Sequence, residues 1–327
     1  VVERIRRSVA APIPHRQDEL FVTASVGIAF CRSEDTTSAT QLLMGADAAM
    51  YRAKALGRNR HSVFDQALRD AAARRGHIDA VLRSAVEQDR VVVHYQRLVD
   101  LVTRRVVGAE ALVRLRDDDG ALLYPDAFLV IADDLGLMPP VEREVLRMAC
   151  EQAVRWRDDG HDLSVSINVC GTQLAKIEDL EAAIGKVLAL SGLAPERLVC
   201  EVTEHRLVET GGRTVAGMQR LRATGVQFAI DDFGTGYASM SYLRHLPVSE
   251  VKIDRQFVVD AETDRRAAAI VRAVAGMARE LDMRCVAEGI EDEQTHELAL
   301  RLGADLGQGY LYARPMSADD FARHLEG

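Results

Sequence analysis

Short apolar segments alternate with amphipathic helical segments from Arg90 to the C-terminus of the chain. Eight of the apolar segments have the length and the content of β-branched and aromatic residues that are typical of buried strands. They are VVVHYQ (91–96), RRVVGAEALVRL (104–115), LSVSINV (163–169), RLVCEVT (197–203), VQFAI (226–230), EVKI (250–253), RCVAE (284–288) and the stretch around GQGYLYA (307–313). The pattern therefore predicts repeated strand–helix units.

The number and spacing of these segments predict an α/β fold, a TIM-type (β/α)8 barrel. The link between 91–96 and 104–115 is too short for a crossover helix, so we expect this first strand pair to be antiparallel and the barrel to be irregular. A doubly wound open sheet is the alternative. It normally has a Gly-rich phosphate turn after its first strand, and no such turn follows 91–96.

Residues 1–65 follow a different pattern. FVTASVGIAF (21–30) predicts a buried strand, Ser38 can cap a helix over 40–56, and RHSVF (60–64) predicts a short strand. These elements are too few to close a core by themselves. We therefore expect a partial α/β fragment over 1–65, a linker helix over 66–79 and the barrel over 80–327.

Charge and cysteine content narrow the function classes. The net charge of −9 argues against bulk nucleic-acid binding, which depends on clustered Lys and Arg. The five cysteines form no CxxC pair, as expected of reduced thiols in the cytoplasm. No apolar stretch approaches the ~18 residues of a membrane span. We expect a cytoplasmic protein, or the cytoplasmic part of a longer one with an upstream sensor or membrane domain.

Polar side chains recur at the carboxyl ends of the predicted strands, where barrels carry their chemistry. They are Glu110, Asn168, Glu201 with Glu204, Asp231 with Asp232, Lys252, Glu288 with Glu291, and Gln308. Adjacent carboxylates repel each other, so a fold tolerates Asp231–Asp232 mainly where cations neutralise both. Oxygen ligands favour Mg²⁺, Mn²⁺ or Ca²⁺ over zinc. There are more carboxylates than one ion needs, which favours a two-ion site of the kind that can clamp the oxygens of an in-line displacement at phosphorus.

Each of these features also has an ordinary structural interpretation. Asp231–Asp232 alone could cap a helix, and Glu201 with Glu204 could form a solvated first helical turn. Lys252 alone would usually be a surface lysine. DDFG is similar to the metal-binding DFG of protein kinases, but the Gly-rich and HRD loops of that family are missing. The number of partner motifs favours the metal site.

Seven motifs together resemble one family. GAEALVRL, SINV, EVTE, DDFGTGY, VKID, AEGIE and GQGY occur in the order and rough spacing of EAL-domain phosphodiesterases, which hydrolyse cyclic di-GMP to linear pGpG. The resemblance runs from about Ala80 to the C-terminus and implies an irregular TIM barrel. The N-terminal FVTASVGIAF and GADAAMYRAKALGRNR resemble the C-terminal part of a GGDEF (diguanylate cyclase) domain without its signature motif. We expect that segment to be a truncated cyclase domain without cyclase activity.

The resemblance also implies a role for each residue, with two Mg²⁺ or Mn²⁺ ions as cofactors. Glu110, Asn168, Glu201 and Asp231 would bind one ion, and Asp231 would bridge to a second ion held with Asp232. Lys252 would position or polarise the attacking water, and Glu288 would bind metal or water near it. The catalytic set is thus Lys252, Glu288 and Glu110. Substrate contacts are implied for Gln96, Arg114, Asp232 and Gln308, and supporting roles for Glu204, Glu291, Gly234, Thr235 and Gly236.

The motifs are compatible with two classes of function. The first is an active phosphodiesterase, and the second is a catalytically silent receptor for cyclic di-GMP. Silent receptors typically lose metal-binding carboxylates, whereas the departures of this chain, such as Arg97 for proline and Cys170 for serine, remove none. We therefore favour the enzyme. A third hypothesis is a scaffold that uses the barrel only for dimer contacts. The resemblance itself implies a homodimer.

Overall fold

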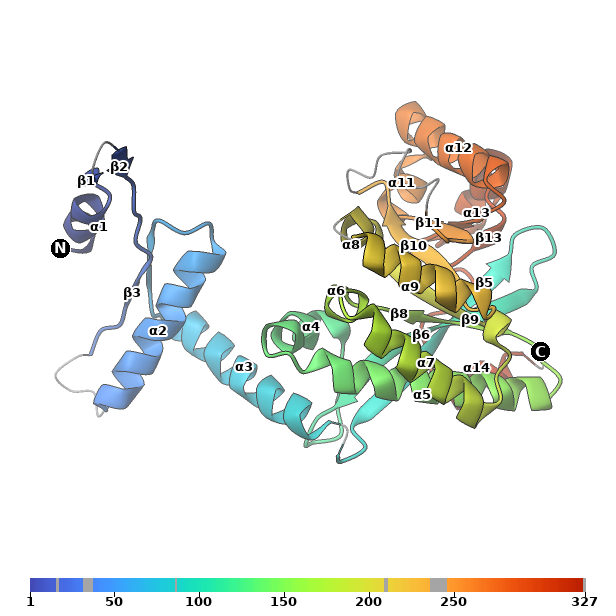
Figure 1. The fold of residues 1–327 in the computed structure, drawn as a ribbon, viewed down its shortest axis with the longest axis horizontal. Coiled ribbons are helices and arrows are strands. Elements are labelled where there is room, and N and C mark those ends of the chain that lie inside the picture. The colour runs from blue at the N-terminus through green and yellow to red at the C-terminus, as the bar shows by residue number, and fades with distance from the viewer. Residues whose placement is uncertain (16–17, 32–37, 86, 209–210, 236–245, 326–327) are drawn as a thin grey trace. The chain divides into compact units, whose positions relative to one another are not determined.

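The computed structural model describes residues 1–327 except 16–17, 32–37, 86, 209–210, 236–245 and 326–327 (Figure 1). The chain forms two compact units, Val1–Ala80 and Val81–Gly327. In the described ranges, no helix is both long and apolar enough to cross a membrane.

The first unit contains few elements. They are α1 (Val2–Val9), the antiparallel pair β1 (Ile13–His15) and β2 (Asp18–Leu20), the parallel pair β3 (Val26–Ile28) and β4 (His61–Val63), and α2 (Ala39–Ala55). The predicted cap at Ser38 is confirmed, because its hydroxyl accepts from the Gln41 amide while the Gln41 side chain accepts from the Ser38 amide. The expected strand over 21–30 is wrong in length. Its partner β4 has only three residues, so pairing is limited to Val26–Ile28.

Helix α3 (Gln66–Ser84) leads into the second unit, where the described residues form a nine-stranded sheet. The strands are β5 (Val91–Asp100), β6 (Val106–Arg116), β7 (Leu122–Leu123), β8 (Ser164–Asn168), β9 (Leu198–Thr203), β10 (Gln227–Phe233), β11 (Glu250–Ile253), β12 (Arg284–Ala287) and β13 (Leu306–Gly307). The pairing of β5 with β6 closes all of them except β7 into a barrel. Strand β5 is antiparallel to both of its neighbours, β6 and β13. The predicted irregular barrel with an antiparallel first pair is therefore confirmed.

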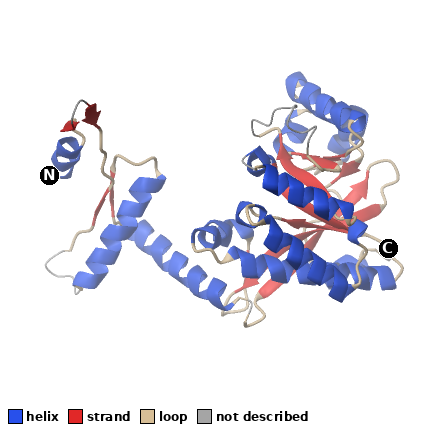
Figure 2. Ribbon diagram, viewed as in Figure 1, coloured by secondary structure: helices blue, strands red, loops and turns tan. Residues whose placement is uncertain are grey.

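Helices cover the outer face of this barrel (Figure 2). The described helices that follow α3 are α4 (Pro125–Asp134), α5 (Met138–Asp158), α6 (Gly171–Leu174), α7 (Ile177–Ser191), η1 (Pro195–Arg197), α8 (Glu204–Val208), α9 (Gly212–Ala223), α11 (Arg255–Asp260), α12 (Arg265–Glu280), α13 (Glu293–Leu302) and α14 (Ala318–Arg323). Trp156 of α5 packs against Tyr95 of β5 and Phe321 of α14, with ring centroids 4.9 and 4.6 Å apart. Large buried rings of this kind contribute much of the core's stability.

The last predicted strand is shorter than GQGYLYA suggests. Only Leu306–Gly307 pairs with β12, and the chain then turns to exchange hydrogen bonds with Ile290. A Cβ at Gly309 would lie 2.0 Å from the Ile290 carbonyl oxygen, so this close approach requires glycine. The turn brings the residues after Gln308 to the carboxyl end of the barrel.

An ion pair between buried Glu250, at the start of β11, and exposed Arg284 gives a stability prediction. Glu250 is 1% exposed and lies 2.9 Å from Arg284, yet among the described residues neither carboxylate oxygen has a hydrogen-bond partner. Burial raises the pKa of Glu250, and Arg284 partly offsets this. Arg284→Ala should lower the free energy of unfolding by about 2 kcal/mol at neutral pH, because it leaves a buried charge unpaired.

This loss should shrink as the pH falls through the raised pKa of Glu250, because the protonated carboxyl no longer needs a cation. Urea unfolding at several pH values measures it. Arg301→Ala is the matched control, because its pair with Glu297 is exposed and should contribute below about 1 kcal/mol. Equal losses for the two variants would contradict the assignment.

Candidate active site

The side chain of Lys252 lies at the centre of a cluster of carboxylates. It is 2% exposed, and its Nζ atom is 2.7 Å from Glu201, 2.8 Å from Glu288, 3.3 Å from Asp231 and 3.4 Å from Glu110. These acids belong to β6, β9 and β10 and to the residue that follows β12. The structure therefore brings together side chains from widely separated parts of the sequence, as predicted, although Glu110 lies in the interior of β6 and not at its end.

Amide side chains orient the Glu110 carboxylate. Gln308 donates to one of its oxygens at 2.6 Å and to the Gln96 side-chain oxygen at 3.0 Å. Asn168 donates to the other Glu110 oxygen at 2.9 Å. Glu110 is thus held in place by Asn168, Gln308 and Lys252, and these contacts fix the direction of its oxygens.

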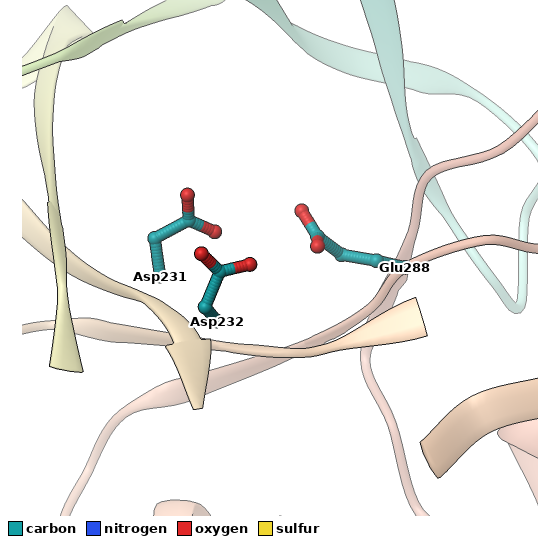
Figure 3. Close-up of side chains that lie close together, drawn as sticks. All are labelled: Asp231, Asp232 and Glu288. Atoms are coloured by element: carbon teal, nitrogen blue, oxygen red, sulfur yellow. The ribbon is translucent and has the colours of Figure 1, made fainter. Parts of the chain in front are cut away.

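Asp231 and Asp232 both face Glu288, although they are adjacent in β10 (Figure 3). Carboxylate oxygens of the three residues lie within 4.8 Å of one another. In a regular strand, neighbouring side chains point to opposite faces. Here the pairing of β10 with β11 shifts register between Ile230 and Phe233, and Asp232 has a left-handed backbone with φ of 54°. This irregularity accounts for two consecutive carboxylates on one side.

The cluster carries more negative charge than Lys252 can neutralise. Burial, together with the nearby Glu110 charge, raises the pKa of Glu201 well above its usual value. Burial and the Asp231 charge raise the pKa of Glu288 to about 7. Burial also acts to raise the pKa of Glu110, but Lys252 and the hydrogen bonds from Gln308 and Asn168 bring it below its usual value. The carboxylates that surround Lys252 raise the pKa of its ammonium group well above the usual value, although burial acts to lower it.

These residues fit divalent cations. The donors are carboxylate and amide oxygens, which suit Mg²⁺ and Mn²⁺. The Asp231 Oδ1 atom is buried and, within the part of the chain that the structure describes, accepts no hydrogen bond, although Lys252 is nearby. A cation at this oxygen would satisfy it and would reduce the repulsion among the acids.

The turn after Asp232 is built on Glu204, whose carboxylate accepts from the Gly234 amide at 2.8 Å. Gly234 has a positive φ of 105°, and a Cβ there would lie 2.7 Å from the Phe257 ring. Thr235 donates its hydroxyl to the Asp232 carbonyl at 2.9 Å. Gly236 lies outside the described residues.

A cavity of about 200 Å³ opens beside the cluster. It is lined by Gln96, Glu110, Arg255, Glu288, Gly289, Glu291, Gln308, Gly309 and Tyr310. Glu291 forms an ion pair with Arg255 at 2.7 Å on its wall. The sequence pattern did not single out Arg255 or Tyr310 as site residues. Arg255 directly follows the motif VKID, and Tyr310 is the last residue of the motif GQGY.

Arg114 is not among the residues that line this cavity. Its side chain is 5% exposed, lies over the Tyr124 ring at 4.9 Å and donates to the Val113 carbonyl at 2.7 Å. Its Nε atom is buried with no hydrogen-bond partner among the described residues. Contact between Arg114 and a phosphate stays a prediction.

Two known families match the chain. The family described as "EAL domain" matches residues 79–315, and that described as "Diguanylate cyclase, GGDEF domain" matches residues 1–60.

The bifunctional diguanylate cyclase/cyclic di-GMP phosphodiesterase MucR of Pseudomonas aeruginosa is 36% identical over 98% of this chain and 46% of its own length. The cyclic di-GMP phosphodiesterase NbdA of the same species is 35% identical over 96% of this chain and 40% of its own. The chain thus spans less than half the length of these curated relatives. The solved structure "PaMucR Phosphodiesterase, c-di-GMP complex" is 38% identical, covers 75% of this chain and 99% of its own, and superposes with a TM-score of 0.71.

Proposed function

The chain belongs to the EAL domain family, and from this premise we propose that it is a divalent-metal-dependent phosphodiesterase that hydrolyses cyclic di-GMP to linear pGpG. The observation that carries the proposal is the convergence of Glu110, Glu201, Asp231 and Glu288 on Lys252 at one end of the barrel. The names of the relatives MucR and NbdA support the choice of substrate.

Glu110, Asn168, Glu201 and Asp231 would hold one Mg²⁺ or Mn²⁺ ion, and Asp231 with Asp232 and Glu288 would hold a second. When bound, such ions lower the pKa of a coordinated water and offset charge on phosphate oxygens. Clustered carboxylates from several strands support this division, because each ion needs several oxygen ligands.

Lys252 acts as a hydrogen-bond donor in this proposal. Its Nζ atom lies within 3.4 Å of Glu110, Glu201, Asp231 and Glu288, so it can orient the oxygen of an attacking water held beside them. Glu288 Oε1 lies 2.8 Å from Lys252 Nζ and also lines the cavity, so it would bind the second ion or the water beside it. Gln96 and Gln308 offer polar contacts to the dinucleotide from the cavity wall.

Replacement of the metal tests the chemistry. Hydrolysis of cyclic di-GMP should stop after chelation, return with Mg²⁺ or Mn²⁺, and be inhibited by Ca²⁺. Calcium is larger, accepts more ligands and holds its water less rigidly. The rate is measured as loss of cyclic di-GMP by liquid chromatography. An equal rate in chelator and in Mn²⁺ would refute metal dependence.

The second candidate is a silent receptor that binds cyclic di-GMP at the same site without cutting it. The described cluster favours the enzyme, because it retains the carboxylates that hydrolysis requires. Tight binding of unchanged ligand in Mn²⁺ would favour the receptor.

The expected context of the enzyme is also a proposal. We propose a homodimer in the cytoplasm, part of a longer protein with an upstream sensor or membrane domain, in which residues 1–65 belong to a cyclase-like domain. The match of residues 1–60 to the GGDEF family supports the last point. Sedimentation of the purified chain tests the dimer.

A further inference from the structure

Among the described residues, the cavity beside the carboxylates encloses too little volume for a whole cyclic dinucleotide. At about 200 Å³ it is below the roughly 300–1,000 Å³ of typical small-molecule sites. Cyclic di-GMP has two purine bases in addition to its ring of sugars and phosphates. If a phosphodiester reaches the cluster, at least one base must extend across the rim of the cavity.

Tyr310 is an exposed aromatic side chain on this rim. It lines the cavity, and 45% of its surface is exposed. Within the described residues it is the one aromatic side chain of the cavity wall. The Arg314 guanidinium lies over the ring at 4.2 Å from its centroid, a cation–π contact that restrains the ring. A restrained, exposed ring is suited to stacking.

The backbone of Tyr310 is fixed relative to the cluster. Gln308, two residues earlier, donates to Glu110 at 2.6 Å, and Gly309 packs directly against the Ile290 backbone. These contacts therefore set the position of the Tyr310 backbone relative to the carboxylates. A base stacked on Tyr310 would be held in a defined register with the phosphodiester.

An exposed tyrosine is usually only a surface residue. Its place on the cavity wall and its restraint by Arg314 favour a specific role. We propose that Tyr310 is a specificity-determining residue whose ring stacks on a purine base of the dinucleotide at the cavity rim. The inference rests on the proposed function.

Steady-state kinetics test the inference. Stacking of a base on an aromatic ring strengthens binding. Tyr310→Ala should therefore raise KM for cyclic di-GMP about tenfold, with kcat changed by less than about threefold. Tyr310→Phe keeps the ring and should restore the low KM. Tyr51→Ala is the matched control, because Arg75 lies over the exposed Tyr51 ring at 5.2 Å in the other unit. A KM of Tyr310→Ala within twofold of wild type, or a loss confined to kcat, would overturn the inference.

A fluorescence titration reads stacking directly, without turnover. The probe is the cyclic dinucleotide with one guanine replaced by 2-aminopurine, added in Ca²⁺. We expect wild type and Tyr310→Phe to quench its emission on binding and Tyr310→Ala to quench it less. Equal quenching by all three, or none by wild type, would overturn the inference. If wild type hydrolyses nothing, the proposed function fails, while this titration still decides the role of Tyr310.

Discussion

Glu110→Gln is expected to abolish hydrolysis of cyclic di-GMP while the barrel stays folded. The substitution keeps the shape of the side chain but removes the charge that would hold a divalent cation. Glu110 accepts hydrogen bonds from Asn168, Gln308 and Lys252, and the glutamine side chain would replace one of its accepting oxygens by a donating NH₂ group. We expect kcat to fall by roughly 10³-fold or more, as for the loss of other preorganised charged groups, and Mn²⁺ affinity by calorimetry to fall with it.

Glu144→Gln is the matched control, because Glu144 lies on α5 and pairs with Arg147 at the surface. It should keep wild-type turnover and Mn²⁺ affinity. Far-ultraviolet circular dichroism checks that both variants are folded. Turnover by Glu110→Gln within tenfold of wild type would refute the role of Glu110 as a metal ligand.

Lys252→Met should cause the second large loss. Methionine has a similar length but cannot donate a hydrogen bond to an attacking water, so we expect kcat to fall by about 10²- to 10³-fold. The substitution also removes the positive charge among four acids. The metal-free variant should therefore unfold at a lower temperature, and Mn²⁺ should raise its Tm more than that of wild type, because the ions replace the missing charge.

Lys186→Met is the control for Lys252→Met. Lys186 is an exposed lysine of α7 and should be replaceable with no effect on kcat or on the Tm shift in Mn²⁺. If Lys252→Met has normal kcat, water positioning by Lys252 is wrong. If it has low kcat and no larger Tm shift in Mn²⁺, the proposed charge balance is wrong.

The barrel and most of its site could be predicted because parallel strands in a barrel end on the same side. This topology brings together Glu201, near the end of β9, and Glu288, just after β12. Glu110 lies in the interior of β6, so the expectation that it ends a strand is wrong. The position of Lys252 could be predicted only in part. Alternation separates it from Val251 and Ile253, but all of β11 is buried, since one strand face meets the interior and the other meets helices.

Other features depend on local geometry that no sequence pattern encodes. Asp231 and Asp232 face the same side only because β10 has a register shift and a left-handed residue. The predicted strand over 307–313 is interrupted because Gly309 packs against Ile290. That turn places Tyr310 on the cavity wall, which a period-two pattern could not predict.

The reaction product tests the central claim most directly. The purified chain is incubated with cyclic di-GMP and Mn²⁺ in ¹⁸O-labelled water. The products are separated by chromatography, and their masses are measured by mass spectrometry. The proposed hydrolysis predicts linear pGpG with one ¹⁸O atom in its terminal phosphate. Cyclic di-GMP recovered unchanged, whether bound or free, would contradict it.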